Sequence, residues 1–310
     1  MEKNPFSIYD FMGYLFPGAL TMFFICYVSC GSFDPYNIFN LELLAKAFTL
    51  DLNVDNCMIG RLVMFVIISY VLGHIVSYLS SLTVEVLFRN MFGYPSGYLL
   101  GDSRIKKGTM WKNYFSHMET IEKLSMRIAV RIVKVILLFI LFPISVMNFT
   151  LGHFFGINAF VTRPLDDNLK HIINNKTQSL LKELEANVDT NSTSKWDSHR
   201  MILHYVYHNI SSSQRKTDNY IALYGFLRCI SFIFCIAFDA LFVYALTTIN
   251  FSAQISWKLV AEVIILFFVA YVSYLGFTKF YRKYTLENYM ALVTEISPKT
   301  SYENLNSQNN

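Results

Sequence analysis

The sequence predicts an all-α integral membrane protein: a helical bundle of four or five transmembrane helices with cytoplasmic helical segments. Of its 310 residues, 54% are hydrophobic and only 15% are charged, whereas soluble domains average about 25% charged residues. The apolar residues gather in five long blocks, each approaching the roughly 20 residues needed to cross a bilayer. Such segments must be helical in lipid, because every backbone polar group needs a partner within the segment.

The predicted organisation follows these blocks and the polar segments between them. The first part is an N-terminal transmembrane hairpin at 1–88, with spans near 12–30 and 58–79, followed by a basic cytoplasmic segment at 89–134. A third membrane segment at 135–160 leads into a helical cytoplasmic segment at 161–219. The last part is a C-terminal transmembrane hairpin at 220–284, with spans near 229–249 and 259–278, and an amphipathic end with a disordered tail at 285–310.

The orientation is predicted from the lysines and arginines, which concentrate on the cytoplasmic side of membrane proteins. Residues 31–57 contain four acidic residues and a single lysine, whereas residues 89–134 contain nine basic residues. The first connection is therefore expected outside and the N-terminus in the cytoplasm. A multi-pass membrane protein is therefore expected, and a bias toward Phe, Tyr, Asn and Lys suits an AT-rich bacterial genome.

The third apolar segment, residues 135–160, gives conflicting orientation signals. Basic residues flank it on both sides, and Pro143 inside it is able to break a helix. One interpretation is a re-entrant or shallow hairpin that enters and leaves on the inner side, which requires non-helical backbone shielded from lipid. The other is a fifth true span, which places the C-terminus outside. The sequence leaves both open.

The span at 229–249 carries a carboxylate, Asp239, at its centre. A charged group there costs about 2.5–3.5 kcal/mol on insertion scales and usually faces a bundle interior or a wet cavity. We expect it to meet His74 of the second span across a helix interface, because a membrane histidine titrates near neutral pH. The pair would form an ion or proton path, or a buried hydrogen bond that fixes helix packing.

Two arginines complete the predicted intramembrane polar site. Arg228 shares a helix face with Asp239 but lies about 16 Å away along the axis, so it is expected to extend to the inner surface. Arg61 lies near the outer end of the second span, either as an ordinary boundary residue or in a second pair with Glu262.

The second span also carries small residues at four-residue intervals, which allow helices to approach closely. These residues are Ser69, Gly73, Ser77 and Ser81. Kinks are expected at Pro17, early in the first span, and at Pro143 in the third apolar segment.

Catalytic and metal-binding signatures were not found. His199, His204 and His208 have no cysteine or carboxylate at a familiar ligand spacing, and no phosphate-binding or hydrolase motif occurs. We therefore predict no catalytic residues, no metal and no cofactor, and the chain is not expected to be an enzyme. The basic run at 104–134 favours contact with membrane lipid over nucleic acid. Whether Cys30 and Cys57 are bonded is left open.

Two stretches, "YDFMGYLFPGAL" and "DNYIALYGFLRCISF", resemble patterns in uncharacterised multi-span bacterial inner-membrane proteins, some of which lie beside anti-phage defence genes. The resemblance covers only these two segments. It implies an inner-membrane protein and a defence effector that perturbs the membrane, and it assigns no functional residues.

The function expected from the sequence is an oligomeric membrane channel or membrane-perturbing effector component, in the setting of bacterial antiviral defence. The alternative is a non-conducting membrane scaffold or sensor that recruits a soluble partner protein through its cytoplasmic segments. Membrane lipid and further copies of the chain are the expected partners, because four or five spans are few for a monomeric transporter.

Overall fold

The computed structural model describes residues 8–30, 58–101, 114–115, 124–157, 161–183, 195–209, 211–252 and 257–295. Within these residues all regular structure is helical and no strand occurs, so the all-α prediction is confirmed for the described part of the chain. Three helical stretches are long and apolar enough to cross a membrane: Leu62–Leu99, Arg215–Thr247 and Trp257–Thr294. A bent helix pair makes a fourth if it counts as one span, and the apolar helix Phe11–Tyr27 is shorter.

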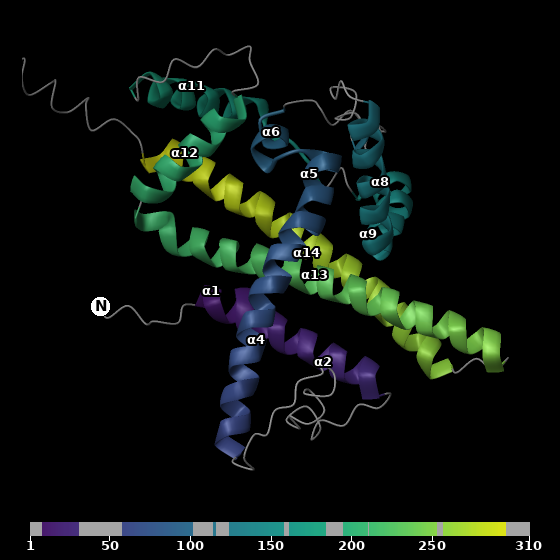
Figure 1. The fold of residues 1–310 in the computed structure, drawn as a ribbon. Helices are drawn as coiled ribbons and strands as arrows, with labels where there is room; N and C mark the ends of the chain where they lie inside the picture. The colour runs from purple at the N-terminus through teal and green to yellow at the C-terminus, as the bar shows by residue number, and fades with distance from the viewer. Residues whose placement is uncertain are drawn as a thin grey trace, which may run out of the picture.

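The longest elements are α13 (Ser211–Ser252) and α14 (Trp257–Glu295), which pack along each other as an antiparallel hairpin (Figure 1). A 42-residue helix such as α13 is about 63 Å long, roughly twice the 30 Å of bilayer hydrocarbon. The two helices are therefore long enough to cross a membrane and continue well beyond it. A buried hydrogen bond from the Ser231 hydroxyl to the Ala270 carbonyl, at 2.9 Å, joins them.

The N-terminal helices lie against this hairpin. A short helix α1 (Ile8–Asp10) and a π-helical turn η1 (Phe11–Leu15) lead into α2 (Phe16–Cys30). The next described helix, α4 (Met58–Ser80), continues through a second π-helical turn η3 (Ser81–Glu85) into α5 (Val86–Phe92). Figure 1 shows α4 crossing α2 and the α13–α14 hairpin rather than running beside them.

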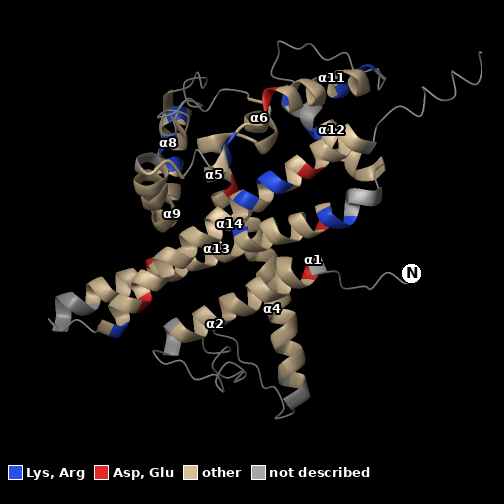
Figure 2. Cartoon of the chain, turned by 180° about the vertical axis from the view of Figure 1, so that it is seen from behind, with Lys and Arg blue, Asp and Glu red and all other residues tan. Residues whose placement is uncertain are grey.

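A helical head covers one end of the hairpin. We use this name for α5, α6 (Pro95–Leu99), α11 (Asp167–Glu183), α12 (Lys195–Asn209) and residues 211–225 and 279–295 of α13 and α14. Part of its core is formed by Leu180, Ile202, Val206 and Leu292, each less than 4% exposed. Figure 2 shows most of the described charged residues on the head and on α8, whereas α4 is uncharged along nearly all its length.

The third apolar segment is broken. It consists of α8 (Leu124–Ile140), α9 (Phe142–Met147) and a π-helical stretch η4 (Asn148–Phe154). The two halves meet at 90° around Leu141, and Pro143 stands in the first turn of α9. Because proline lacks the N–H needed inside a helix but is accommodated in a first turn, Pro143 explains why α8 ends here.

Candidate functional site

The most closely connected polar group between the apolar helices is centred on Arg228 of α13. Its guanidinium forms an ion pair with Glu85 of η3, and its Nε donates to the Ser80 hydroxyl at 3.1 Å. A further N–H donates to the Ser77 carbonyl at 3.4 Å. Only 12% of the Arg228 side chain and 21% of the Glu85 side chain are exposed. Arg228 therefore ties α13 to α4 and η3, instead of extending freely to the surface as the sequence suggested.

His74 takes part in an aromatic cluster on the outside of α4. Its ring stacks on Tyr14 of η1 with centroids 3.8 Å apart, and it meets Tyr70 edge-on at 4.7 Å. His74 lies one turn before Ser77 on α4, and the Ser77 carbonyl contacts Arg228 of α13. Asp239 lies about 16 Å from Arg228 along the axis of α13. The structure accordingly does not bring His74 and Asp239 together.

Asp239 is half-buried in the C-terminal half of α13. Its neighbours on the helix surface are apolar and exposed: Ile236, Phe242 and Val243. On the other side, Phe238 stacks on Phe142 of α9 with ring centroids 6.1 Å apart, so the elbow of the third apolar segment lies close by. The ion pairs of the described residues join other groups and do not involve Asp239.

The proposed pair of Arg61 and Glu262 is only partly described. Arg61 belongs to α4, but its side chain lies outside the described part of the structure, as do Cys30 and Cys57. Glu262 of α14 accepts a hydrogen bond from the Tyr27 hydroxyl of α2 at 2.8 Å, and Lys258 lies 4.0 Å from it. Glu262 thus joins α14 to the far end of α2.

The small residues of α4 lie at two different contacts. Gly73 is so close to η1 that an added Cβ would stand 1.8 Å from the Tyr14 carbonyl oxygen. Ser69 is fully buried, and its carbonyl oxygen would lie 1.6 Å from a Cβ on Gly18. Ser77 contributes its carbonyl to the Arg228 group, and the Ser81 hydroxyl donates to the Tyr78 carbonyl within its own helix.

Pro17 lies in the first turn of α2, directly after the π-helical turn η1. The Phe16 N–H donates to the Phe11 carbonyl, the five-residue spacing of a π-turn. The helix therefore widens just before the proline.

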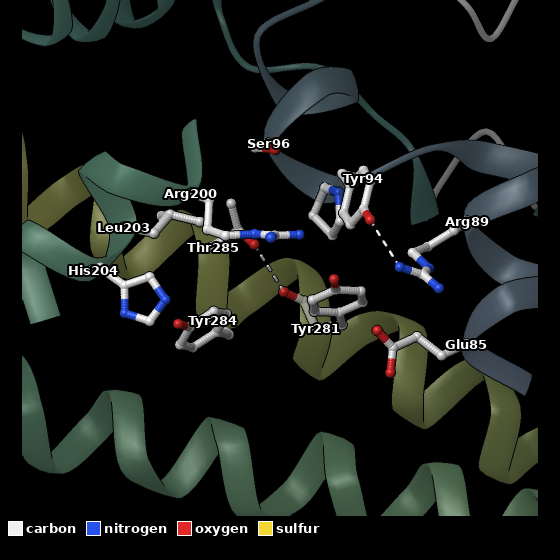
Figure 3. A pocket seen from close by; sticks show the side chains of 11 residues that line it. Glu85, Arg89, Tyr94, Ser96, Arg200, Leu203, His204, Tyr281, Tyr284 and Thr285 are labelled. Carbon is white, nitrogen blue, oxygen red and sulfur yellow. Dashed lines mark hydrogen bonds between the residues drawn. The ribbon is translucent and has the colours of Figure 1, made fainter. Parts of the chain in front are cut away.

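A polar pocket of about 240 Å³ opens in the head between α5, α6, α12 and α14. It is lined by Glu85, Arg89, Tyr94, Pro95, Ser96, Arg200, Leu203, His204, Tyr281, Tyr284 and Thr285. Figure 3 shows the Arg200 side chain reaching from α12 across the pocket toward Tyr94. Arg89 donates to the Tyr94 hydroxyl at 2.8 Å, and the Thr285 hydroxyl donates to the Tyr281 carbonyl at 3.3 Å.

The described residues contain no group of three or more His, Cys, Asp or Glu side chains arranged to hold a metal ion. His204 and His208 stack one turn apart on α12, with ring centroids at 6.5 Å. His199 belongs to α12, but its side chain is outside the described part.

Sequence reasoning missed Glu85, Ser80 and the pocket residues of the head. Glu85 and Arg228 have opposite charges, and the sequence predicts both of them near the cytoplasmic ends of the second and fourth spans. The sequence therefore contained a signal for this ion pair. The pocket had no comparable signal, because its residues come from segments separated by as many as 200 positions, from Glu85 to Thr285.

No protein-family model, no curated protein and no solved structure matches this chain. Its functional interpretation therefore depends on its own residues.

Proposed function

We propose that this chain is a component of an oligomeric membrane channel or membrane-perturbing effector, in which Asp239 faces a second copy or a water-filled path. Asp239 is the observation that carries the proposal. It stands half-buried in an apolar span, outside the ion pairs of the described residues, and beside exposed apolar side chains. A carboxylate facing lipid there costs about 2.5–3.5 kcal/mol, and a neighbouring copy or water removes much of that cost.

The long helices support a role for the head in control. Because α13 and α14 run without interruption from the head into the apolar half, a displacement in the head moves the segment that carries Asp239. In the proposed mechanism, the head sets the arrangement of the spans between copies. The resemblance to proteins near defence genes adds antiviral defence as the proposed setting.

Ion flux from liposomes that contain the purified protein tests this function. Asp239→Asn keeps the size of the side chain and removes its charge, so we expect flux to fall at least tenfold. Glu262→Gln, near the start of α14, should leave flux unchanged. Chemical crosslinking should show that both variants assemble like the wild type. Equal flux from all three proteins contradicts the role of Asp239 in the path, and no flux from the wild type contradicts the conducting function.

The second candidate is a non-conducting sensor or scaffold that recruits a soluble partner. The observation in its favour is the head itself, which has its own apolar core and a polar pocket. In that case Asp239 serves helix packing. A partner that copurifies with the wild type, together with absent flux, favours this function over conduction.

A further inference from the structure

The head pocket has a positive lining that the channel proposal leaves unused. Two guanidinium groups line it from different elements, Arg89 from α5 and Arg200 from α12, and His204 stands one turn after Arg200. Glu85 is the only acidic residue among those lining the pocket, and its charge is already balanced by Arg228. The charges of the pocket lining therefore favour an anion over a cation.

The geometry narrows the class of anion. A guanidinium offers five N–H donors in a planar fork that matches the oxygens of a phosphate group. Arg89 gives one donor to Tyr94 and keeps the others, and Arg200 extends across the opening (Figure 3). A volume of about 240 Å³ holds a phosphate with a small attached group, and it lies below the roughly 300–1,000 Å³ of pockets for drug-sized ligands.

The aromatic lining favours an organic phosphate over the bare ion. Tyr94, Tyr281 and Tyr284 line the same pocket, so an attached group meets ring faces while the phosphate meets the arginines. We propose that the pocket binds a phosphate ester, with its phosphate between Arg89 and Arg200.

Two sources supply this chemistry: a phospholipid headgroup and a soluble phosphate ester. Arg89 lies one helical turn after Glu85, at the point where the largely uncharged α4 and η3 end and the head begins. If α4 lies in the membrane, this point is at the membrane surface, so a lipid headgroup can reach the pocket. Since Glu85 lines the pocket and also holds Arg228, an occupant stands directly against the contact that joins α4 to α13. The inference does not require the chain to conduct ions.

Binding to the intact chain in detergent tests the site. The probes are inorganic phosphate, phenyl phosphate as a soluble ester and short-chain phosphatidic acid as a lipid ester, each titrated while thermal stability and heat of binding are recorded. Saturable binding of phosphatidic acid alone identifies a lipid source, and binding of phenyl phosphate identifies a soluble one. If none of the three probes binds saturably, the proposal is overturned.

Arg200→Gln is the diagnostic variant, because Arg200 is exposed and its substitution should leave the fold intact. Losing a charge-assisted hydrogen bond to phosphate should weaken binding at least tenfold. Arg215→Gln is the matched control: Arg215 is exposed on α13 and does not line the pocket, so binding should change less than twofold. Equal weakening by the two substitutions indicates general charge attraction and overturns the assigned site.

Discussion

At the scale of single residues, the ion pair of Arg228 and Glu85 is the strongest polar link between the apolar helices. Both side chains are largely withdrawn from water, and Ser80 and the Ser77 carbonyl satisfy further N–H groups of the guanidinium. Removing one partner from such a pair leaves the other charge buried and uncompensated, which typically costs about 3–5 kcal/mol. The pair is therefore more sensitive to losing one member than to losing both.

Arg228→Met should lower the free energy of unfolding by about 3 kcal/mol, because Glu85 is left without its partner. The double variant Arg228→Met with Glu85→Gln should recover part of that loss. Denaturation in detergent measures both values as a double-mutant cycle.

The pair of Lys258 and Glu262 provides the control, since its atoms are 4.0 Å apart and the Lys258 side chain is 83% exposed. Lys258→Met should change stability by less than about 1 kcal/mol. A similar small effect for Arg228→Met would show that the buried pair does not hold the helices together.

At the scale of helices, the crossing of α4 with η1 and α2 depends on two glycines. A Cβ on Gly18 or Gly73 would stand 1.6 or 1.8 Å from a backbone carbonyl oxygen of the other helix. Backbone atoms yield less readily than the end of a flexible side chain, so either substitution has to push the helices apart. Close backbone approach through small residues is a common basis of helix association in membranes.

Gly73→Ala should destabilise the protein by about 2 kcal/mol, within the range of overpacked interiors. Gly60→Ala lies in the same helix with nothing within 4 Å of the added Cβ, and it should be neutral or stabilising because alanine favours helix. Thermal denaturation of both variants in detergent measures the difference. If Gly73→Ala is as stable as Gly60→Ala, the close crossing does not form.

Local patterns predicted the helices better than their contacts. The apolar blocks marked the long helices, and Pro143 marked a break at which the structure bends by 90°, because these features depend on neighbouring residues. The pairing of Arg228 with Glu85 was missed, because Glu85 is 143 positions away and Arg228 was expected to extend to the membrane surface. Asp239 and His74 were predicted to pair because both are ionisable residues inside predicted spans. In the structure α4 packs against η1, and His74 stacks on Tyr14.

At the scale of the whole molecule, the chain before the third apolar segment meets the chain after it. The Leu165 N–H donates to the Leu99 carbonyl at 3.0 Å. The chain after the segment is also tied to α14, because Arg282 donates to the Arg163 carbonyl at 2.8 Å. Lys176 of α11 donates to the Val293 carbonyl of α14 at 2.7 Å. Because α6 and α11 lie on the same head, we infer that the bent segment α8–η4 leaves this end of the bundle and returns to it.

Accessibility of single cysteines, in a variant whose five native cysteines are replaced, tests this re-entrant topology. Asp167 has a 97% exposed side chain in α11, and Lys258 begins α14 at the other end of the bundle. With a re-entrant segment, Asp167→Cys should be labelled from the same side as an N-terminal tag, and Lys258→Cys from the opposite side. A segment that crosses the membrane reverses both results, because each position then lies beyond one more span. The comparison uses the tag as its reference, so, with α2 and α4 both crossing the membrane, it decides between the two topologies whichever way the whole protein is inserted.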